Sequence, residues 1–399
     1  MPPMRIALIA SNRFPIRQPF AGGLEAHVWH LARALTRAGH QVSLFAAPDS
    51  DPSLDCAALQ VRYLELSAAA STDPSMPGPA FMADHHAYLT LMLRLARHGT
   101  DEFDVIHNHS LHHLPVAMAP TLATPMLCTL HTPPTPWLES AISATAGAGA
   151  RFAAVSAYTA RSWQHLLPDV TIVRNGVDGR RWPLGPGGPD LVWFGRITPE
   201  KGPHLAIDAA RRAGRPLVIA GPVSDPDYFA RDVEPRLGGE VRYVGHLAHR
   251  ELAHLVGASA AALVTPQWDE PYGLVVAEAM MCGTPIVAFD RGGIPEIVDS
   301  RGGLLVPTGD VTAMAAAIPH TLTMSRRAVH TVATQRCSAA VMVADYLAMY
   351  HAMIDDSGRT DTDDRVLHPP PGHRASPPGA EHLHPLGRAG HRAHVAEAR

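Results

Sequence analysis

Cysteine, net charge and long apolar runs are all scarce in this chain of 399 residues. Its four cysteines, none of them in a C-x-x-C pair, are Cys56, Cys128, Cys282 and Cys337. Their wide spacing in apolar surroundings predicts buried free thiols in a reducing compartment and excludes a disulfide framework. The net charge is only −4 and the basic residues are scattered, which argues against a nucleic-acid surface or a polybasic membrane patch.

Segments that would lead the chain into or across a membrane are also lacking. The first apolar run, residues 6–10, has the length of a strand, without the charged start and cleavage site of a signal peptide. No run approaches the ~20 apolar residues of a membrane span. The sequence therefore predicts a cytoplasmic protein. No G-x-G-x-x-G motif follows an expected first strand, which disfavours a dinucleotide oxidoreductase.

What the chain does have is an alternation of short apolar runs with helical patterns. Buried parallel strands are predicted at residues 4–10, 41–46, 61–64, 105–107, 126–130, 152–155 and 171–173. A second series is predicted at residues 191–194, 217–220, 241–244, 261–264, 285–288 and 304–306. We therefore expect an α/β fold with two doubly wound sheets, which bind ligands outside the carboxyl ends of their strands.

A Pro- and Gly-rich stretch, residues 184–189, predicts a hinge linker between two domains. The first domain is expected at residues 1–183 and the second at residues 190–336. A helical pattern follows at residues 337–354. From there the apolar pattern gives way to Pro, Gly, His and Arg, so residues 355–399 are predicted to be a disordered tail, with an interaction role as the less favoured alternative.

The most informative segment, residues 268–298, is WDEPYGLVVAEAMMCGTPIVAFDRGGIPEIV. Gly273 and Leu274 open a helical pattern, where backbone N–H groups lack partners and the dipole is positive, as suits a diphosphate. Glu270 precedes this helix and Glu278 lies in its second turn. Carboxylates accept hydrogen bonds from sugar and ribose hydroxyls, so the pattern indicates a phosphorylated-sugar site. An ordinary surface helix with solvated glutamates is the alternative.

The E-x7-E spacing, followed by G-T-P and G-G-x-x-E, resembles the nucleotide-sugar site of retaining GT-B-fold glycosyltransferases of the family four, group 1 type. The resemblance covers residues 4–353. It implies two Rossmann-like domains facing each other across a cleft, with the C-terminal helix returning to the first domain. It also implies a hexosyltransferase in which Glu278 holds the ribose and Glu270 holds the transferred sugar.

Two cations follow the first strand of the second series, in the stretch FGRITPEKG. Arg196 and Lys201 flank a strand-to-helix turn, and together they can hold one diphosphate, Arg in a bidentate manner and Lys as a point charge. The resemblance places both on the donor phosphates, beside Gly195. A solvated surface pair is the alternative.

A Gly-Gly pair follows the first strand of the chain, in the stretch AGGLE. Gly22 and Gly23 permit a close backbone approach at the start of the next helix. The resemblance implies that this loop closes over the donor phosphates or meets the acceptor. Glu25 is expected either to point into the cleft on the acceptor side or to offset the helix dipole.

Histidines end two strands of the first series. The resemblance implies that His131 faces the donor sugar and supports the transition state. It also implies that His107 or His109 lines the acceptor side, without deciding between them. Further matches with less certain roles are Ser156, Asn175, Gly176, Val177, Asp178, Gly292, Gly293 and Glu296. Among them, the backbone N–H groups of Gly292 and Gly293 are expected to meet the sugar or phosphate, and Glu296 is expected to cap the segment that follows it.

The 25 histidines raise the question of zinc. Clusters at residues 107–113 and 84–86 are candidates, but no Cys or Glu partner has convincing spacing. The resembled family works without a bound metal, and no Asp-x-Asp pair is placed here to hold a divalent ion on the diphosphate. We therefore expect no metal and no other cofactor.

The sequence thus predicts transfer of a hexosyl group from a nucleotide-diphosphate sugar, with UDP-glucose expected first, to a small-molecule or glycan acceptor. GDP-mannose and UDP-N-acetylglucosamine follow as donors. The resemblance implies retention by front-face attack. A phosphorylase or epimerase fits less well, and a non-catalytic sensor or scaffold is the alternative from another class. No nucleic-acid partner is expected, and transient membrane-surface contact stays open.

Overall fold

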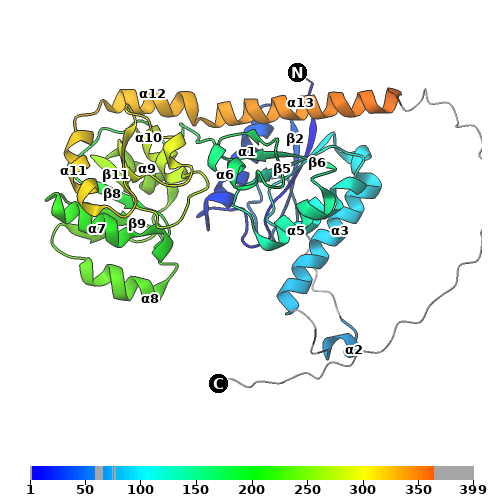
Figure 1. Cartoon of the computed structure of the whole chain (residues 1–399), viewed down its shortest axis with the longest axis horizontal. Coiled ribbons are helices and arrows are strands. Elements are labelled where there is room, and N and C mark those ends of the chain that lie inside the picture. Colours follow the sequence, from blue (N-terminus) through cyan, green and yellow to red (C-terminus); the bar gives the residue numbers. More distant parts are fainter. Residues whose placement is uncertain (1, 59–65, 74, 76–77, 364–399) are drawn as a thin grey trace, which may run out of the picture. The chain divides into compact units, whose positions relative to one another are not determined.

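Two parallel sheets organise the residues that the computed structural model describes, which are 2–58, 66–73, 75 and 78–363 (Figure 1). The first sheet has the strand order β3-β2-β1-β4-β5-β6-β7, and the second has the order β10-β9-β8-β11-β12-β13. In each sheet the chain starts in the middle, winds to one edge, and then returns to build the other side. This confirms the predicted α/β fold with two doubly wound, Rossmann-like sheets.

The first sheet and its helices comprise β1 (Arg5–Ile9), α1 (Gly23–Arg37), β2 (Gln41–Ala46), β3 (Cys56–Ala58), α2 (Ala68–Ser71), α3 (Pro79–Glu102), β4 (Val105–Asn108), α4 (His113–Met118), η1 (Ala119–Thr121), β5 (Met126–Leu130), α5 (Pro136–Thr145), β6 (Ala150–Ala154), α6 (Ala157–Ser162) and β7 (Thr171–Ile172). The second sheet and its helices comprise β8 (Leu191–Phe194), η2 (Pro199–Lys201), α7 (Pro203–Arg212), β9 (Leu217–Ala220), α8 (Pro226–Tyr228), η3 (Phe229–Val233), η4 (Glu234–Arg236), β10 (Val241–Tyr243), α9 (His249–Gly257), β11 (Ala261–Val264), α10 (Leu274–Met281), β12 (Ile286–Phe289), η5 (Ile294–Glu296), β13 (Gly303–Val306), α11 (Val311–Thr321) and α12 (Arg326–Arg336). The final helix is α13 (Ala339–Asp363).

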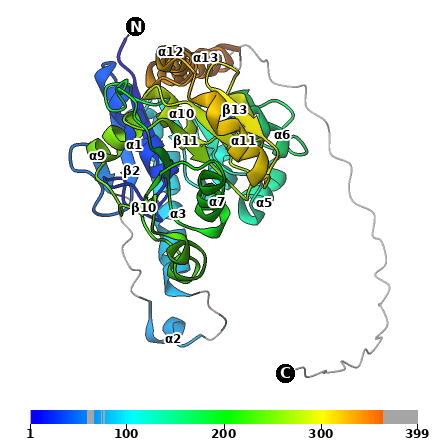
Figure 2. The ribbon, with the colours of Figure 1, turned by 90° about the vertical axis from the view of Figure 1, so that its left-hand side faces the viewer.

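The central strands are mostly apolar because helices cover both faces of each sheet. Their sequences include RIALI in β1, MLCTL in β5 and LVWF in β8, and almost every side chain in them is buried. Strands β1 and β2 pair in parallel and lie side by side (Figure 2). In the same sheet Ile9 pairs with Asn108, so that β1 and β4 end at one edge. The loops after these strands therefore meet at that edge.

Helix α1 shows how a local pattern positions site residues. Its buried face carries Val28, Leu31 and Leu35 at helical spacing. The same face buries two polar side chains, Glu25 and His27. Burial of polar groups on an apolar face costs free energy, so these two side chains call for a functional or structural partner.

Helix α13 packs on the first sheet, as the predicted fold requires. Met342, Tyr346 and Tyr350 are buried in one cluster with strand residues such as Ile6 and Leu8. The helix continues to Asp363, past the expected helix end at residue 354. Residues 364–399, which hold most of the expected tail, lie outside the described residues.

Several elements differ from the expectation. The strand expected at residues 61–64 falls outside the described residues, and β3 lies before it. Helix α5, which starts in a proline-rich stretch, and the largely polar helix α12 were not predicted. Among the described residues no helix is both long and apolar enough to cross a membrane. The expected domain limits around residues 184–189 stay a prediction.

Candidate active site

The two expected phosphate-binding cations lie in the loop that leaves β8. Gly195, with a φ of 151°, begins this loop, and Arg196 follows it. Lys201 ends the short turn η2, directly before Gly202 and helix α7. Gly202 has a φ of 62°, and a Cβ atom added there would lie 2.4 Å from the carbonyl oxygen of Thr265. This close approach fixes the loop against the residue that follows β11.

Lys201 forms a mostly buried ion pair with Glu270. The Lys201 Nζ atom contacts Glu270 Oε1, and the two side chains are 23% and 11% exposed. The indole Nε1 of Trp268 donates to the same carboxylate oxygen at 3.0 Å, and Lys201 Nζ lies 5.4 Å from the centre of the Trp268 ring. Such a charge-assisted pair holds both side chains in place. A diphosphate beside Lys201 would compete with Glu270 for the ammonium.

Arg196 is more open than Lys201. Its nearest acidic partner is Glu200, at 3.8 Å, and both side chains are exposed. The charge of this guanidinium also acts on the carboxyl of Glu25 in α1. Burial raises the pKa of the Glu25 carboxyl, and the positive charge of Arg196 opposes that rise. The predicted acceptor-side glutamate and the predicted donor-side arginine are therefore electrostatic neighbours.

The Gly-Gly loop after β1 lies against the start of α10. A Cβ atom on Gly22 would lie 3.1 Å from Glu25 Oε2, and one on Gly23 would lie 3.0 Å from Leu274 Cδ1. A larger side chain at either position would push on the site. The structure thus brings together the loop that opens α1 and the helix start that was expected to bind a diphosphate.

Helix α10 depends on the backbone of Gly273. This residue has a φ of 103°, and a Cβ atom there would lie 3.0 Å from Ile294 Cγ1. One turn later Glu278 is partly buried. Burial raises the pKa of its carboxyl to about 8, which leaves it mostly protonated at pH 7. Within the described parts of the chain no group is hydrogen-bonded to this carboxyl, which leaves it for a ligand.

The loop of Gly292 and Gly293 packs against the backbone of Glu270. The Gly293 N–H donates to the carbonyl oxygen of Glu270 at 2.7 Å. Gly292 has a φ of 61°, and a Cβ atom there would lie 2.3 Å from the same oxygen. The suggestion that both N–H groups meet a sugar or phosphate is therefore wrong for Gly293, whose N–H is already used to position Glu270.

Ser156 and Glu296 connect the start of α6 to loops of the second sheet. The Ser156 hydroxyl donates to the Pro271 carbonyl oxygen at 2.5 Å. The Glu296 carboxylate accepts hydrogen bonds from the N–H groups of Ala157 and Tyr158 at 2.8 and 2.7 Å. Glu296 therefore caps the N-terminus of α6, which is far from it in sequence, and not the segment that follows Glu296.

The Asn175–Asp178 stretch, residues 175–178, serves packing. The Val177 N–H donates to the Cys337 carbonyl oxygen at 2.7 Å. A Cβ atom on Gly176 would lie 2.6 Å from the Ala339 Cα atom. This part of the chain pairs with the segment that leads into α13, which explains its Asn-Gly turn without a ligand.

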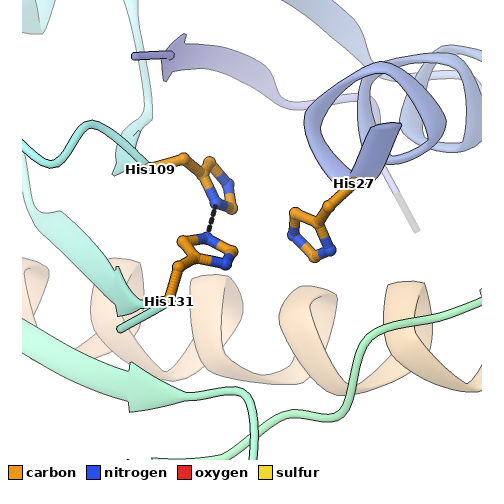
Figure 3. A group of neighbouring side chains, drawn as sticks. All are labelled: His27, His109 and His131. Carbon is orange, nitrogen blue, oxygen red and sulfur yellow. Dashed lines mark hydrogen bonds between the residues drawn. The ribbon is translucent and has the colours of Figure 1, made fainter. Parts of the chain in front are cut away.

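Three histidines meet beside the carboxyl ends of β4 and β5 (Figure 3). His109 Nδ1 and His131 Nε2 are hydrogen-bonded at 2.9 Å, and His27 of α1 lies across from them. Burial lowers the pKa of His27 and His109 well below the usual range and that of His131 to about 3. All three rings are therefore neutral at pH 7. At 9% exposure, His131 is the most accessible of them.

His107 has a different position from the one expected. Its Nδ1 is hydrogen-bonded to the Tyr350 hydroxyl at 2.6 Å, and its Nε2 to the Thr129 hydroxyl at 2.7 Å. The ring is fully buried. With both nitrogens occupied inside the first sheet, His107 anchors α13 and has no atom left for an acceptor. His109 is the member of this pair that lies beside His131.

Sequence reasoning missed three residues of this region: His27, Trp268 and Tyr350. His27 lies three residues after Leu24 and four before Leu31, so a polar residue on an apolar helical stripe was the available signal. Trp268 adjoins the glutamate motif, and its aromatic ring was read only as sequence context. Nothing in the sequence connects Tyr350 with His107.

Two groups of histidines have ring nitrogens close enough to share a metal ion. One consists of His27, His109 and His131, and the other of His85, His112 and His113. The first group is buried, and the second is partly exposed. The histidines of the stretch 107–113 are thus divided between these two groups, and His107 belongs to neither group.

Comparison with known proteins identifies the family from both halves of the chain. The pattern described as "Glycosyltransferase Family 4" matches residues 21–181, and that described as "Glycosyl transferases group 1" matches residues 180–336. A glycogen synthase of Mycobacterium tuberculosis is 32% identical, over 79% of this chain and 85% of that protein. A D-inositol 3-phosphate glycosyltransferase of Mycolicibacterium paratuberculosis is 29% identical, over 83% of this chain and 87% of that protein.

Solved structures share the fold at lower identity. A sucrose-phosphate synthase from Thermosynechococcus elongatus has a TM-score of 0.68 at 21% identity, covering 88% of this chain and 99% of that chain. The Anabaena protein HepE, in complex with UDP and glucose, has a TM-score of 0.67 at 17% identity, covering 88% of this chain and 100% of that chain. Both similarities support two Rossmann-like halves of the GT-B type.

Proposed function

This chain belongs to the group 1, family 4 glycosyltransferases, and from that premise we propose that it transfers a glucosyl group from UDP-glucose to an acceptor hydroxyl with retention of anomeric configuration. The observation that carries the proposal is the convergence of Arg196, Lys201 and Glu270 with the start of α10. Cations, a helix N-terminus and carboxylates together suit a sugar linked to a diphosphate.

In this proposal Arg196 and Lys201 hold the diphosphate. Lys201 exchanges its partner Glu270 for phosphate oxygens, and the exposed Arg196 binds them in a bidentate manner. The backbone of Gly195 lets the loop approach the phosphates closely, and the first turn of α10, from Gly273 and Leu274, supplies N–H donors. These groups neutralise the charge that develops on UDP as the glycosidic bond breaks.

The two glutamates recognise the hydroxyl groups of the donor. Once Lys201 turns to phosphate, Glu270 keeps its hydrogen bond from Trp268 and accepts further bonds from hydroxyls of the glucosyl ring. Glu278 accepts bonds from the ribose hydroxyls. Because burial keeps Glu278 mostly protonated, binding of the ribose favours its ionised form and releases a proton.

The first sheet supplies the other side of the site. His131 presents a neutral ring to the transferred sugar, and its hydrogen bond to His109 fixes the orientation of that ring. A neutral imidazole can hydrogen-bond a sugar hydroxyl without competing for the phosphates. Gly22, Gly23 and Glu25 lie where the acceptor approaches, next to Arg196 and Leu274.

Retention follows from front-face attack in this scheme. The acceptor hydroxyl enters on the face from which UDP departs, through an oxocarbenium-like state, and the departing phosphate receives its proton. No side chain is assigned the role of a covalent nucleophile. The enzyme contributes position and electrostatic stabilisation.

Similar proteins support glucose as the transferred sugar and a soluble acceptor. HepE was solved with UDP and glucose, and one relative is named a glycogen synthase. Another is named a D-inositol 3-phosphate glycosyltransferase, which points to a small polyol. We therefore propose a glycan or a small hydroxylated molecule as the acceptor, with GDP-mannose and UDP-N-acetylglucosamine as the next donors to test.

The direct test is donor consumption by the full chain. UDP-glucose is incubated with a panel of oligoglucans and polyols, UDP release is measured, and the anomeric configuration of any product is read by NMR. The expected result is acceptor-dependent UDP release with an α-linked product. An inverted product would refute the mechanism. If UDP binds but no donor is consumed with any acceptor or with water, a non-catalytic sensor becomes the better account.

A further inference from the structure

The buried histidine group beside the proposed site has the geometry of a metal site. Its members come from three elements: His27 from α1, His109 from the end of β4 and His131 from the end of β5 (Figure 3). The ring centres lie 4.9, 5.2 and 5.2 Å apart, in a nearly equilateral triangle. One ligand nitrogen from each ring lies within 4.8 Å of the others.

The spacing of the rings fits one shared ion. A Zn–N(His) bond is about 2.0–2.1 Å long, and the centre of an imidazole lies roughly 1.2 Å beyond its nitrogen. Three rings on one tetrahedral ion therefore have centres about 5 Å apart. The observed triangle already has this size, so rotation of the rings about their side-chain bonds is the main change that binding would need.

Unpaired ring nitrogens give independent support. Both nitrogens of His27 and the Nε2 of His109 are buried without a hydrogen-bond partner among the described residues. Buried polar atoms nearly always have a partner, and an exception calls for an explanation such as an ion. The rings are also neutral at pH 7, because burial lowers the pKa of each one. Neutral imidazole is the form that binds metals.

We propose that His27, His109 and His131 bind a divalent transition-metal ion, with Zn²⁺ the expected one, through one nitrogen of each ring. A site of three imidazoles leaves a position open for water or another ligand. Binding replaces the hydrogen bond between His109 and His131 with two bonds to the ion. The expectation of a chain without metal is thereby revised for this position alone.

One consequence rests on the proposed function. His131 is the histidine assigned to the transferred sugar, so an ion on its ring removes that contact. Bound Zn²⁺ should then inhibit glucosyl transfer. The ion acts here as an inhibitor at a site next to the donor, and no step of the transfer uses it.

The second histidine group is a weaker candidate and serves as the internal control. His112 Nδ1 already accepts a hydrogen bond from the Leu114 N–H at 3.2 Å, and its ring stacks on Tyr88. His113 stacks on Trp137. These rings have partners in the protein, so an ion is not needed to explain them.

The test titrates the metal-free full chain with Co²⁺, whose visible absorption reports a protein-bound site, and then displaces it with Zn²⁺. His27→Leu removes one ligand, His27→Gln repeats the test with a polar side chain, and His113→Gln removes a ring from the other group. All of these proteins keep the histidines of residues 364–399. Differences in Co²⁺ binding between them therefore come from the two histidine groups.

We expect the wild type and His113→Gln to bind one Co²⁺ with visible absorption and to gain thermal stability with Zn²⁺. Both His27 variants should bind at least about a hundredfold more weakly, since even outer partners of metal sites are worth about 10–100-fold. No absorption in the wild type, or equal binding in the His27 variants, would overturn the proposal, as would loss of binding in His113→Gln alone.

A parallel assay separates this inference from the proposed transferase activity. Activity with and without Zn²⁺ is compared as a ratio within each variant. We expect the ratio to fall in the wild type and to stay near one in His27→Leu. If Co²⁺ binds but transfer is unaffected, the inhibitory role is refuted and the metal site stands. If no variant transfers glucose, the absorption data still decide whether the ion binds.

Discussion

Replacing Glu278 with glutamine should stabilise the folded protein, and increasingly so as the pH rises. The carboxyl lies in the second turn of α10, where burial raises its pKa to about 8 from an ordinary value of 4.5. Between these values the folded state binds a proton that the unfolded state has lost. Wild-type stability therefore falls with rising pH over this window, whereas glutamine carries no titrating group.

The size of the effect follows from the two pKa values. Proton linkage makes the free energy of unfolding of Glu278→Gln higher than that of the wild type by roughly 2 kcal/mol at pH 6 and roughly 4 kcal/mol at pH 8. Above pH 8 this difference changes little. The increase between pH 6 and pH 8 is therefore roughly 2 kcal/mol. For a chain of this size it amounts to a few degrees in Tm.

The assay is thermal unfolding of both proteins at pH 6, 7 and 8. The exposed Glu234→Gln variant, in η4, is the control for removing a surface carboxyl. We expect the Tm difference between Glu278→Gln and wild type to widen steadily after subtraction of the control. A constant difference across the range would refute the reasoning, and a narrowing one would mean that the carboxylate is stabilised by partners in the folded protein.

Three further predictions follow from single contacts. Lys201→Met keeps the side-chain stem but removes the ammonium beside Glu270, so kcat/KM for UDP-glucose should fall by about 10²–10³ in a steady-state assay; a change below threefold would contradict the phosphate role. Gly273→Ala should cost about 1–3 kcal/mol of stability and should also weaken donor binding. Its control is Gly39→Ala, which has a φ of 92° and open space around it and should affect stability alone. Equal donor affinity in the two variants would count against the α10 site. Tyr350→Phe leaves the buried His107 Nδ1 without its 2.6 Å hydrogen-bond partner and should lower the free energy of unfolding in urea by about 1–3 kcal/mol. Tyr346→Phe should cost less, because the Tyr346 hydroxyl lies 3.3 Å from Thr129. The reverse order would show that His107 does not anchor α13.

The fold could be predicted because parallel strands buried on both faces leave a plain signal. Strands such as β2, β5 and β8 have the bounds that their apolar runs suggested. Helix α12 escaped prediction because its sequence RRAVHTVATQR is mostly polar, and only three of its side chains are buried. Helix α5 begins at a proline, which favours a first helical position as well as a turn.

Groups of the candidate site that are neighbours in sequence could be predicted, whereas contacts between residues far apart in the chain could not. Arg196 and Lys201 belong to one short loop, and the glutamates belong to one motif. The burial of His107 depends on Tyr350, 243 residues away in the chain, so no local pattern separates it from His109. The group of His27, His109 and His131 likewise forms only when α1 packs beside β4 and β5.

The most direct test of the central claim is calorimetric titration of the full chain with UDP, GDP and ADP, alongside Arg196→Ala and Glu278→Ala. The account predicts that UDP binds in preference to the other two nucleotides and that each variant loses this binding while retaining the fold. If no nucleotide binds the wild type, or if UDP binds both variants as tightly as the wild type, the proposed donor site is wrong.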